Sequence, residues 1–253
     1  MYTIEKEQGN TALEKRTVGE IVADDYRTAE VFQRHRIDFC CGGNKPLREA
    51  CEEKNVNVQT VVGDLEQIHD SGGVTENYNE WAPDFLADYI VNQHHAYARQ
   101  VIPQLNAFAE KVARVHGDRH PETREIAEIW LETGGNMITH MQREELVLFP
   151  YIKRLSSADG EGSKAKSPTF DSAEKFIAEL EDDHNVVGDS LAKLKSLSSG
   201  FTPPQGACNT YRGLYASLQE FAAKTKEHIH LENNILFPKA IRFANASSEA
   251  VME

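Results

Sequence analysis

The sequence lacks long apolar runs and an excess of positive charge. No apolar run approaches the roughly 20 residues that span a bilayer, and 26% of the chain is charged. Residues 1–10 are charged and polar, so we expect no export by a signal peptide. A net charge of −13, from 40 acidic and 27 basic residues, argues against nucleic acid or an anionic membrane as a partner. We therefore expect a soluble protein.

Cysteine is scarce as well, with four residues at positions 40, 41, 51 and 208 of a 253-residue chain. Cys40 and Cys41 are adjacent and are sterically poor partners for one disulfide. A chain of this length can bury enough apolar surface to fold without such bonds. The cysteines are therefore predicted to be thiols in a reducing, cytoplasmic setting.

The sequence has no alternating strand pattern of useful length, which leaves an α/β fold without support. Its second part instead has helical periodicity in four long segments. Prolines near the starts of two of them, Pro83 and Pro121, suit a first helical turn. Four helices with three connections predict an antiparallel four-helix bundle. The predicted helices run over about 83–115, 121–155, 171–197 and 207–243, and the connection at 156–169 is polar and expected to be mobile.

The first part of the chain predicts a small helical unit. Thr17, followed by Glu20, has the pattern of a capping box and begins a helix expected to reach about Arg34. The turn Asp-Phe-Cys-Cys-Gly-Gly follows at 38–43, and shorter helices are expected at 46–54 and 58–68. The predicted domains are an extension at 1–16, a small helical domain at 17–70 and the bundle at 81–244, with a linker at 70–80.

Each predicted bundle helix has one histidine on its apolar stripe, and two of them also have a glutamate there. The stripe of the first helix runs from Val91 to Leu105, and that of the second from Ile126 to Val147. Buried imidazoles and carboxylates cost several kcal/mol apiece when they have no partner. A lone histidine on such a stripe is usually a hydrogen-bonded core residue, but six polar residues together favour a metal site. The candidate ligands are His95, His140, Glu144, His184, His228 and Glu232.

Internal repetition supports the same site. The frame H-x3-E-x3-L-F-P occurs from His140 and again from His228, 88 residues later, and His95 and His184 are 89 residues apart. A helix pair therefore occurs twice, and its ligands are expected to be related by a pseudo-twofold axis. Residues four apart on a helix are neighbours, so each histidine can bind one metal while its glutamate bridges two.

The ligand types predict iron. Imidazole and carboxylate without thiolate favour iron or manganese, whereas structural zinc usually has a closed tetrahedral set, often with cysteine. The other di-metal pattern of four-helix bundles, Glu-x-x-His with four carboxylates as in ferritin-like proteins, does not fit this histidine-rich set. We expect two iron ions with an oxo or hydroxo bridge, and one position open on each ion for O2, NO or water.

The repeated H-x3-E frame with paired outer histidines resembles the hemerythrin-like fold. Together with the double-cysteine turn at 38–43, the sequence resembles the iron-sulfur cluster repair di-iron family, the Repair of Iron Centres proteins, over about residues 17–243. This resemblance implies a bacterial cytoplasmic protein that restores iron-sulfur clusters damaged by nitric oxide or peroxide, by supplying iron. Its partners would be iron-sulfur proteins, and its state a monomer or homodimer. The family's six ligands correspond to the candidate ligands.

Two other functions stay open at this point. One is an enzyme activity, reduction of NO at the di-iron centre, and the other is reversible binding or sensing of O2 or NO. Cys40 and Cys41 are either a packed small-residue turn or a redox or iron-relay pair that would count as catalytic. His94 and His230 are predicted to be solvent-facing or to lie behind the ligands. His116 is predicted to flank the first turn between bundle helices, with an approach to the metal pair or to a substrate tunnel as the alternative. Cys208 is predicted to be a packing residue.

Overall fold

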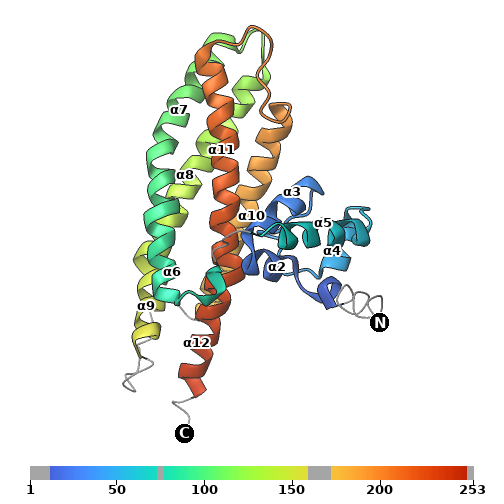
Figure 1. Ribbon diagram of the computed structural model, residues 1–253. Helices are drawn as coiled ribbons and strands as arrows, with labels where there is room; N and C mark the ends of the chain where they lie inside the picture. Colours follow the sequence, from blue (N-terminus) through green and yellow to red (C-terminus); the bar gives the residue numbers. More distant parts are fainter. Residues whose placement is uncertain (1–11, 73–76, 159–171, 250–253) are drawn as a thin grey trace. The chain divides into compact units, whose positions relative to one another are not determined.

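In the computed structural model, residues 12–72, 77–158 and 172–249 are described, and helices joined by turns and loops make up these ranges (Figure 1). The only strand-like feature among these residues is an isolated antiparallel bridge between Thr17 and Pro46. The predicted all-α class is confirmed. Within the described ranges, no helix combines the length and the apolar character needed to cross a membrane.

Contacts between Cα atoms divide the chain into two compact units. One unit comprises residues 1–82 together with 229–239, and the other comprises residues 83–228 together with 240–253. The short stretch 229–239 is continuous with the last bundle helix, yet it packs with the N-terminal residues.

The four predicted bundle helices are present, with ends within a few residues of the expected positions, except that the fourth extends further. Consecutive long helices run in opposite directions, and α8 packs against both α7 and α10 (Figure 1). The first helix consists of α6 (Pro83–Tyr89), η3 (Ile90–His95) and α7 (Ala96–His116), and the second of α8 (Glu122–Arg143), η4 (Glu144–Leu148) and α9 (Phe149–Ala158). The third is α10 (Ala173–Leu197), and the fourth consists of α11 (Asn209–Leu231), η5 (Glu232–Leu236) and α12 (Phe237–Glu249).

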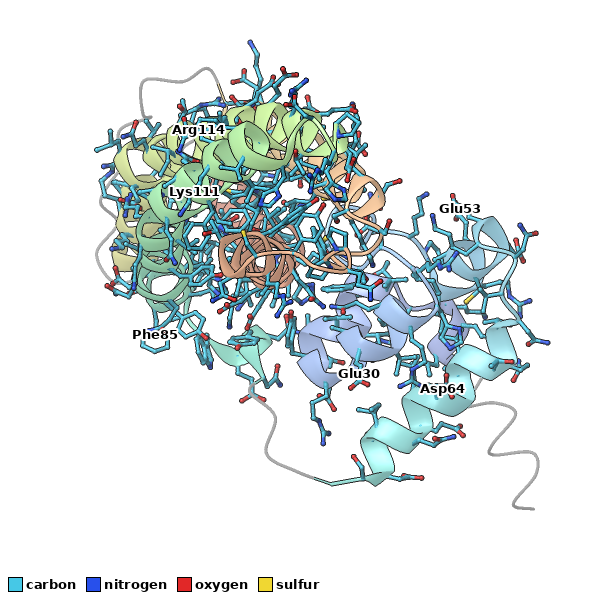
Figure 2. The ribbon with its side chains drawn as sticks, turned by 90° about the horizontal axis from the view of Figure 1, so that it is seen from above. Glu30, Glu53, Asp64, Phe85, Lys111 and Arg114 are labelled. Carbon is cyan, nitrogen blue, oxygen red and sulfur yellow. The ribbon has the colours of Figure 1, made fainter. Side chains whose placement is uncertain are left out.

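The core of the bundle is formed by the predicted apolar stripes. It includes Leu105, Trp130, Leu191 and Leu218, one from each long helix. Charged residues outside the stripes face solvent, as Figure 2 shows for Lys111 and Arg114 of α7. This amphipathic division of each helix is the reason that polar residues on the stripes become buried.

Three of the four bundle helices contain a π-turn, namely η3, η4 and η5. In η4 the amide of Phe149 donates to the carbonyl of Glu144, five residues earlier, and in η5 Phe237 donates to Glu232 in the same way. A proline follows each phenylalanine, and proline can neither donate a helical hydrogen bond nor pack closely on the carbonyl four residues before it. The repeated Leu-Phe-Pro sequence therefore coincides with a widened turn directly after each glutamate.

At two positions near the π-turns, the predicted apolar stripe is wrong. Val147 and Val91 are only partly buried, and the neighbouring Leu148 and Ile90 occupy the core. A π-turn takes up one more residue than an α-turn, so the residues beyond it are out of phase by about one position. The stripe of α10, which has no π-turn, is buried at all of its predicted positions.

The small N-terminal helices follow the prediction with one correction. The predicted capping box is present, because the Thr17 hydroxyl accepts from the amide of Glu20 and the Glu20 carboxylate accepts from the amide of Thr17. The single helix expected to reach Arg34 is instead interrupted at Asp25, which has extended backbone angles and caps the next turn. The elements are α2 (Val18–Asp24), η1 (Tyr26–Thr28), α3 (Ala29–Arg34), α4 (Leu47–Glu53) and α5 (Val58–Asp70).

The predicted linkers fall partly outside the described residues. Residues 73–76 of the first linker and 159–171 of the polar connection are in that category. The described part of the first linker contains η2 (Tyr78–Glu80), a short 3-10 turn. At the polar connection, α9 continues to Ala158, which is beyond its predicted end.

Two glycines allow the double-cysteine turn to pack closely on residues 229–239. Asn234 of η5 donates its side-chain amide to the carbonyls of Phe39, at 3.3 Å, and Cys40, at 3.1 Å. A Cβ on Gly43 would lie 2.7 Å from the Phe39 carbonyl oxygen and 2.3 Å from the Asn234 side chain. The backbone amide of Gly19 also donates to the Gly43 carbonyl, at 2.7 Å. The turn is therefore held at a fixed position on η5.

We expect Gly43→Ala to lower the stability of the protein, because a backbone oxygen blocks the new methyl group. Overpacking of this kind costs about 1–3 kcal/mol. The matched control is Gly63→Ala in α5, where a Cβ would meet nothing within 4 Å and where alanine favours the helix by about 0.5–1 kcal/mol. Calorimetric melting of both variants measures the difference, and a Gly43→Ala protein that melts no lower than the wild type would contradict the packing described.

Candidate metal centre

The six predicted ligands are buried and lie together at the level of the π-turns. Each is at most 3% exposed. His95 ends η3, Glu144 begins η4 and Glu232 begins η5, so three of the six lie on π-turns. Such turns occur often at functional sites in proteins.

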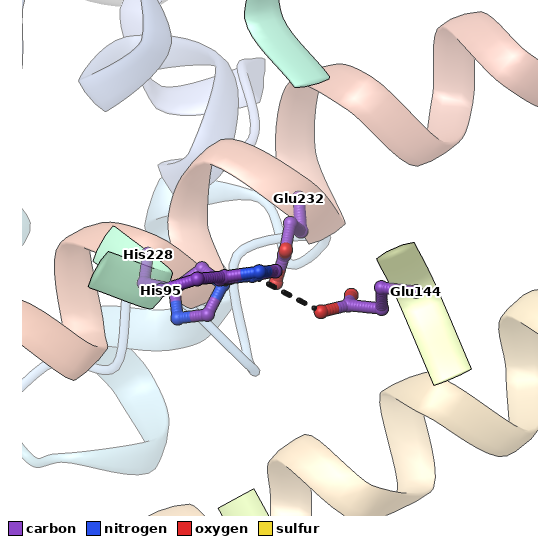
Figure 3. Close-up of side chains that lie close together, drawn as sticks. All are labelled: His95, Glu144, His228 and Glu232. Atoms are coloured by element: carbon purple, nitrogen blue, oxygen red, sulfur yellow. Dashed lines mark hydrogen bonds and ion pairs between the residues drawn. The ribbon is translucent and has the colours of Figure 1, made fainter. Parts of the chain in front are cut away.

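The donor atoms form two sets that could each hold one metal ion. The first set consists of His95, His228, Glu144 and Glu232, which Figure 3 shows converging on one point. The second consists of His140 and His184 with the same two glutamates. Each histidine therefore belongs to one set, and each glutamate belongs to both.

The distances suit ligands of a common ion. In the first set, Nε2 of His95 lies 3.0 Å from Nε2 of His228, and in the second, Nε2 of His140 lies 2.9 Å from Nε2 of His184. Two donors each bound about 2.1 Å from an ion and at right angles to one another are about 3.0 Å apart. The observed spacing therefore fits two imidazoles at adjacent coordination positions of one first-row metal.

The Glu144 carboxylate spans the two sets. Its Oε2 lies 3.3 Å from Nε2 of His95 (Figure 3), whereas its Oε1 lies 3.4 Å from Nε2 of His140. One oxygen thus faces each set, which is the arrangement of a bridging carboxylate. Together the donor types and the distances fit a pair of oxygen- and nitrogen-bound cations.

Two carboxylates that the sequence pattern did not predict lie behind the histidines. Glu145 Oε1 lies 2.6 Å from Nδ1 of His95 and also pairs with Arg99, at 2.5 Å. Asp183 Oδ2 lies 3.3 Å from Nδ1 of His140 and pairs with Arg143, at 2.8 Å. A carboxylate on Nδ1 fixes the imidazole tautomer so that Nε2 has its lone pair directed at the metal. Each set therefore contains one histidine oriented in this way.

The sequence offered only a weak signal for these carboxylates. Glu145 is adjacent to Glu144, and Asp183 is adjacent to His184, so both are one position off a predicted stripe. Their contacts cross from one helix to another and depend on the relative rotation of those helices. Helical periodicity alone does not specify that rotation.

His94 and His230 are both buried, at 5% and 0% exposed, and the part of the prediction that allowed them to face solvent is wrong. The π-turn η3 changes the side-chain phase, and the ring of His94 stacks on His228 with centroids 5.4 Å apart. His230 packs against Phe39 and Tyr26, with centroids 5.9 Å apart in each case. Burial lowers the pKa of His230 to about 4, so this imidazole is neutral at pH 7.

His116 takes no part in the two sets. It ends α7, about 30 Å along the helix from His95 at a rise of about 1.5 Å per residue. Its Nε2 lies 3.3 Å from the Cys208 thiol, and its ring packs on Tyr211. Cys208 is exposed rather than packed in the core, so that prediction is wrong.

The double-cysteine turn brings together a third group of donor atoms. The Asp38 carboxylate and the thiols of Cys40 and Cys41 lie within 4.8 Å of one another. Cys40 is buried, Cys41 is half-buried and Asp38 is exposed. A hydrogen bond with Cys41, followed by burial and by the charge of Asp38, raises the pKa of the Cys40 thiol well above its usual value. In the absence of a metal, the Cys40 thiol is therefore protonated at neutral pH.

Fold and site together define a helical-bundle protein of the hemerythrin class. Residues 86–240, more than half of the chain, match the hemerythrin HHE cation binding domain. Residues 14–69 match ScdA_N, a domain of unknown function.

Full-length relatives specify the family further. The chain is 37% identical to the iron-sulfur cluster repair protein YtfE of Yersinia pseudotuberculosis serotype O:1b (strain IP 31758), over 85% of this chain and 92% of that protein. It is 36% identical to the protein of the same name from Yersinia pestis (strain Pestoides F), with the same coverage. The chain belongs to this family of hemerythrin-like iron-sulfur cluster repair proteins, and the resemblance found in the sequence is confirmed.

We expect Glu145→Gln to weaken metal binding, because the amide no longer supplies the charge that orients His95. Loss of such a partner typically costs about 10–100-fold in metal affinity. Asp183→Asn should have a smaller effect, since its contact to His140 is 3.3 Å and its side chain is 42% exposed. Glu179→Gln is the control, because Glu179 pairs with Arg143 but not with a ligand histidine. Chelator competition measures each affinity, and equal values for Glu145→Gln and wild type would contradict the role of Glu145.

Proposed function

We propose that the six buried residues hold two iron ions, with one ion in each set and Glu144 and Glu232 bridging the pair. Four protein donors per ion leave positions for an oxo or hydroxo bridge and for one exchangeable ligand. The position of the Glu144 carboxylate between the sets supports this arrangement most directly. We further propose the domain limits 1–16, 17–70 and 81–244.

We propose that the protein restores damaged iron-sulfur clusters by supplying iron. The relatives named above are iron-sulfur cluster repair proteins, and the present chain has the buried donor groups that such a role needs. Its clients would be cytoplasmic iron-sulfur proteins damaged by nitric oxide or peroxide. Iron is then the cargo of the reaction. Each ion has a coordination position that the protein does not occupy, where a ligand from outside the protein can bind while the ion enters or leaves.

The residues of the chain have separate tasks in this process. The imidazoles provide neutral donors that release an ion more readily than thiolates would. The two glutamates supply negative charge inside the bundle, and Glu145 and Asp183 keep two of the imidazoles in the metal-binding tautomer. Core residues of the four helices exclude bulk water around the donors. When bound, the iron pair supplies redox chemistry and affinity for small ligands such as NO and O2.

The shared glutamates predict different metal contents for different variants. Glu144→Ala should lose both ions, because this residue belongs to both sets, whereas His95→Ala should keep the ion of the other set. Glu128→Ala, an exposed change on α8, is the control with full iron content. Iron analysis and Mössbauer spectroscopy measure the result, with a coupled iron pair expected only in the wild type and the control. Zinc, or one ion per chain in the wild type, would contradict the proposed centre.

Repair itself can be tested with an enzyme whose cluster has been damaged by nitric oxide. We expect the iron-loaded wild type and Glu128→Ala to restore its activity and Glu144→Ala to have no effect. Restoration by an iron-free variant would show that iron supply is not the mechanism. Production of N2O by the loaded protein in a single turnover, without restoration, would favour NO reduction instead.

A further inference from the structure

We propose that Asp38, Cys40 and Cys41 form a second metal site, open to solvent, that takes up one thiophilic divalent cation. Its identification as ferrous iron rests on the proposed repair function. The donor types differ from those of the bundle ligands. This group has two thiols and one carboxylate, whereas each bundle set has two imidazoles and two carboxylates. They supply three donors and leave at least one coordination position for an external ligand.

The spacing of the donors fits such an ion. Metal bonds of about 2.3 Å to sulfur and about 2.0–2.2 Å to oxygen place tetrahedral neighbours roughly 3.5–3.8 Å apart. The Cys40 sulfur lies 3.2 Å from Asp38 Oδ1, and all three donor atoms lie within 4.8 Å of one another. Small side-chain rotations therefore suffice to bind an ion.

The backbone of the turn is already fixed in position. Asp38 accepts hydrogen bonds from the amides of Cys40, at 3.0 Å, and Gly42, at 3.1 Å. Asn234 holds the carbonyl of Cys40, and Asn234 lies in η5, two residues after Glu232. One π-turn thus holds both a bundle ligand and the thiol turn. A preorganised turn lowers the entropy cost of ordering the ligands when an ion binds.

Burial decreases from Cys40 through Cys41 to Asp38, so the site opens towards solvent on the side of the carboxylate. Binding converts two thiols and one divalent ion into two metal-thiolate bonds and releases two protons, and no electron transfer is involved. The site has three protein donors and keeps a coordination position open, whereas structural zinc sites are closed by four protein donors.

The test uses Co2+, whose thiolate complexes absorb in the near ultraviolet. The full-length variant Glu144→Gln/Glu232→Gln removes the bridging charges of the bundle, so that the thiol site can be titrated alone. We expect one equivalent of Co2+ to produce thiolate-to-cobalt absorption and to release about two protons. Adding Cys41→Ser or Asp38→Asn should weaken binding at least tenfold. Cys208→Ser, which changes an exposed thiol outside the group, should have no effect.

Absence of the thiolate absorption, or unchanged binding in the Cys41→Ser protein, would overturn the second site. Cys41 is only half-buried, so its serine variant is expected to fold, and circular dichroism checks this. The same titration is then made with Fe2+ under anaerobic conditions, where a third equivalent should bind to the wild type but not to Cys41→Ser. If the wild-type protein binds cobalt at the thiols but repairs no cluster, the second metal site is supported and the proposed repair function is contradicted.

Discussion

A buried carboxylate facing two pairs of imidazoles is the interaction on which the rest of the structure depends. Glu144 is 0% exposed, and its two oxygens point at histidines of different sets. A negative charge in an apolar core is costly unless compensated by partners or ions. The histidines, one from each of the four bundle helices, and the π-turns that place the glutamates can all be understood as compensation for this charge. The stability of the bundle and its capacity for metal are therefore linked.

The sequence predicted the inner part of the site because that part follows helical periodicity. His184, His228 and Glu232 lie at regular steps on amphipathic helices, and the helix repeat indicated a paired arrangement. It did not predict the π-turns, since their hydrogen bonds depend on a backbone widening that changes the phase by one residue. Two observations follow from that widening: His94 is buried, and Leu148 rather than the predicted Val147 lies in the core. Glu145 and Asp183 were missed because contacts across helices depend on how those helices are rotated.

The two repeats share their inner residues but differ in the residues around them. In the first repeat Arg143 and Glu145 pair with partners of the neighbouring helices, whereas the second has Leu231 and Asn233 at the corresponding positions. Conversely, Asn234 of the second repeat binds the double-cysteine turn. The sequence repeat thus includes the candidate ligands but not the residues around them. The two halves of the site are therefore chemically distinct.

The counterpart of Asn234 in the first repeat is Leu146, which is 76% exposed. It lies in η4, two residues after Glu144, and its side chain lies outside the core. This position is a natural attachment point for a spin label or a fluorophore. A probe there would sit within one helical turn of a bridging carboxylate without replacing any candidate ligand. Distances from it to a paramagnetic ion would then locate the metal pair in solution.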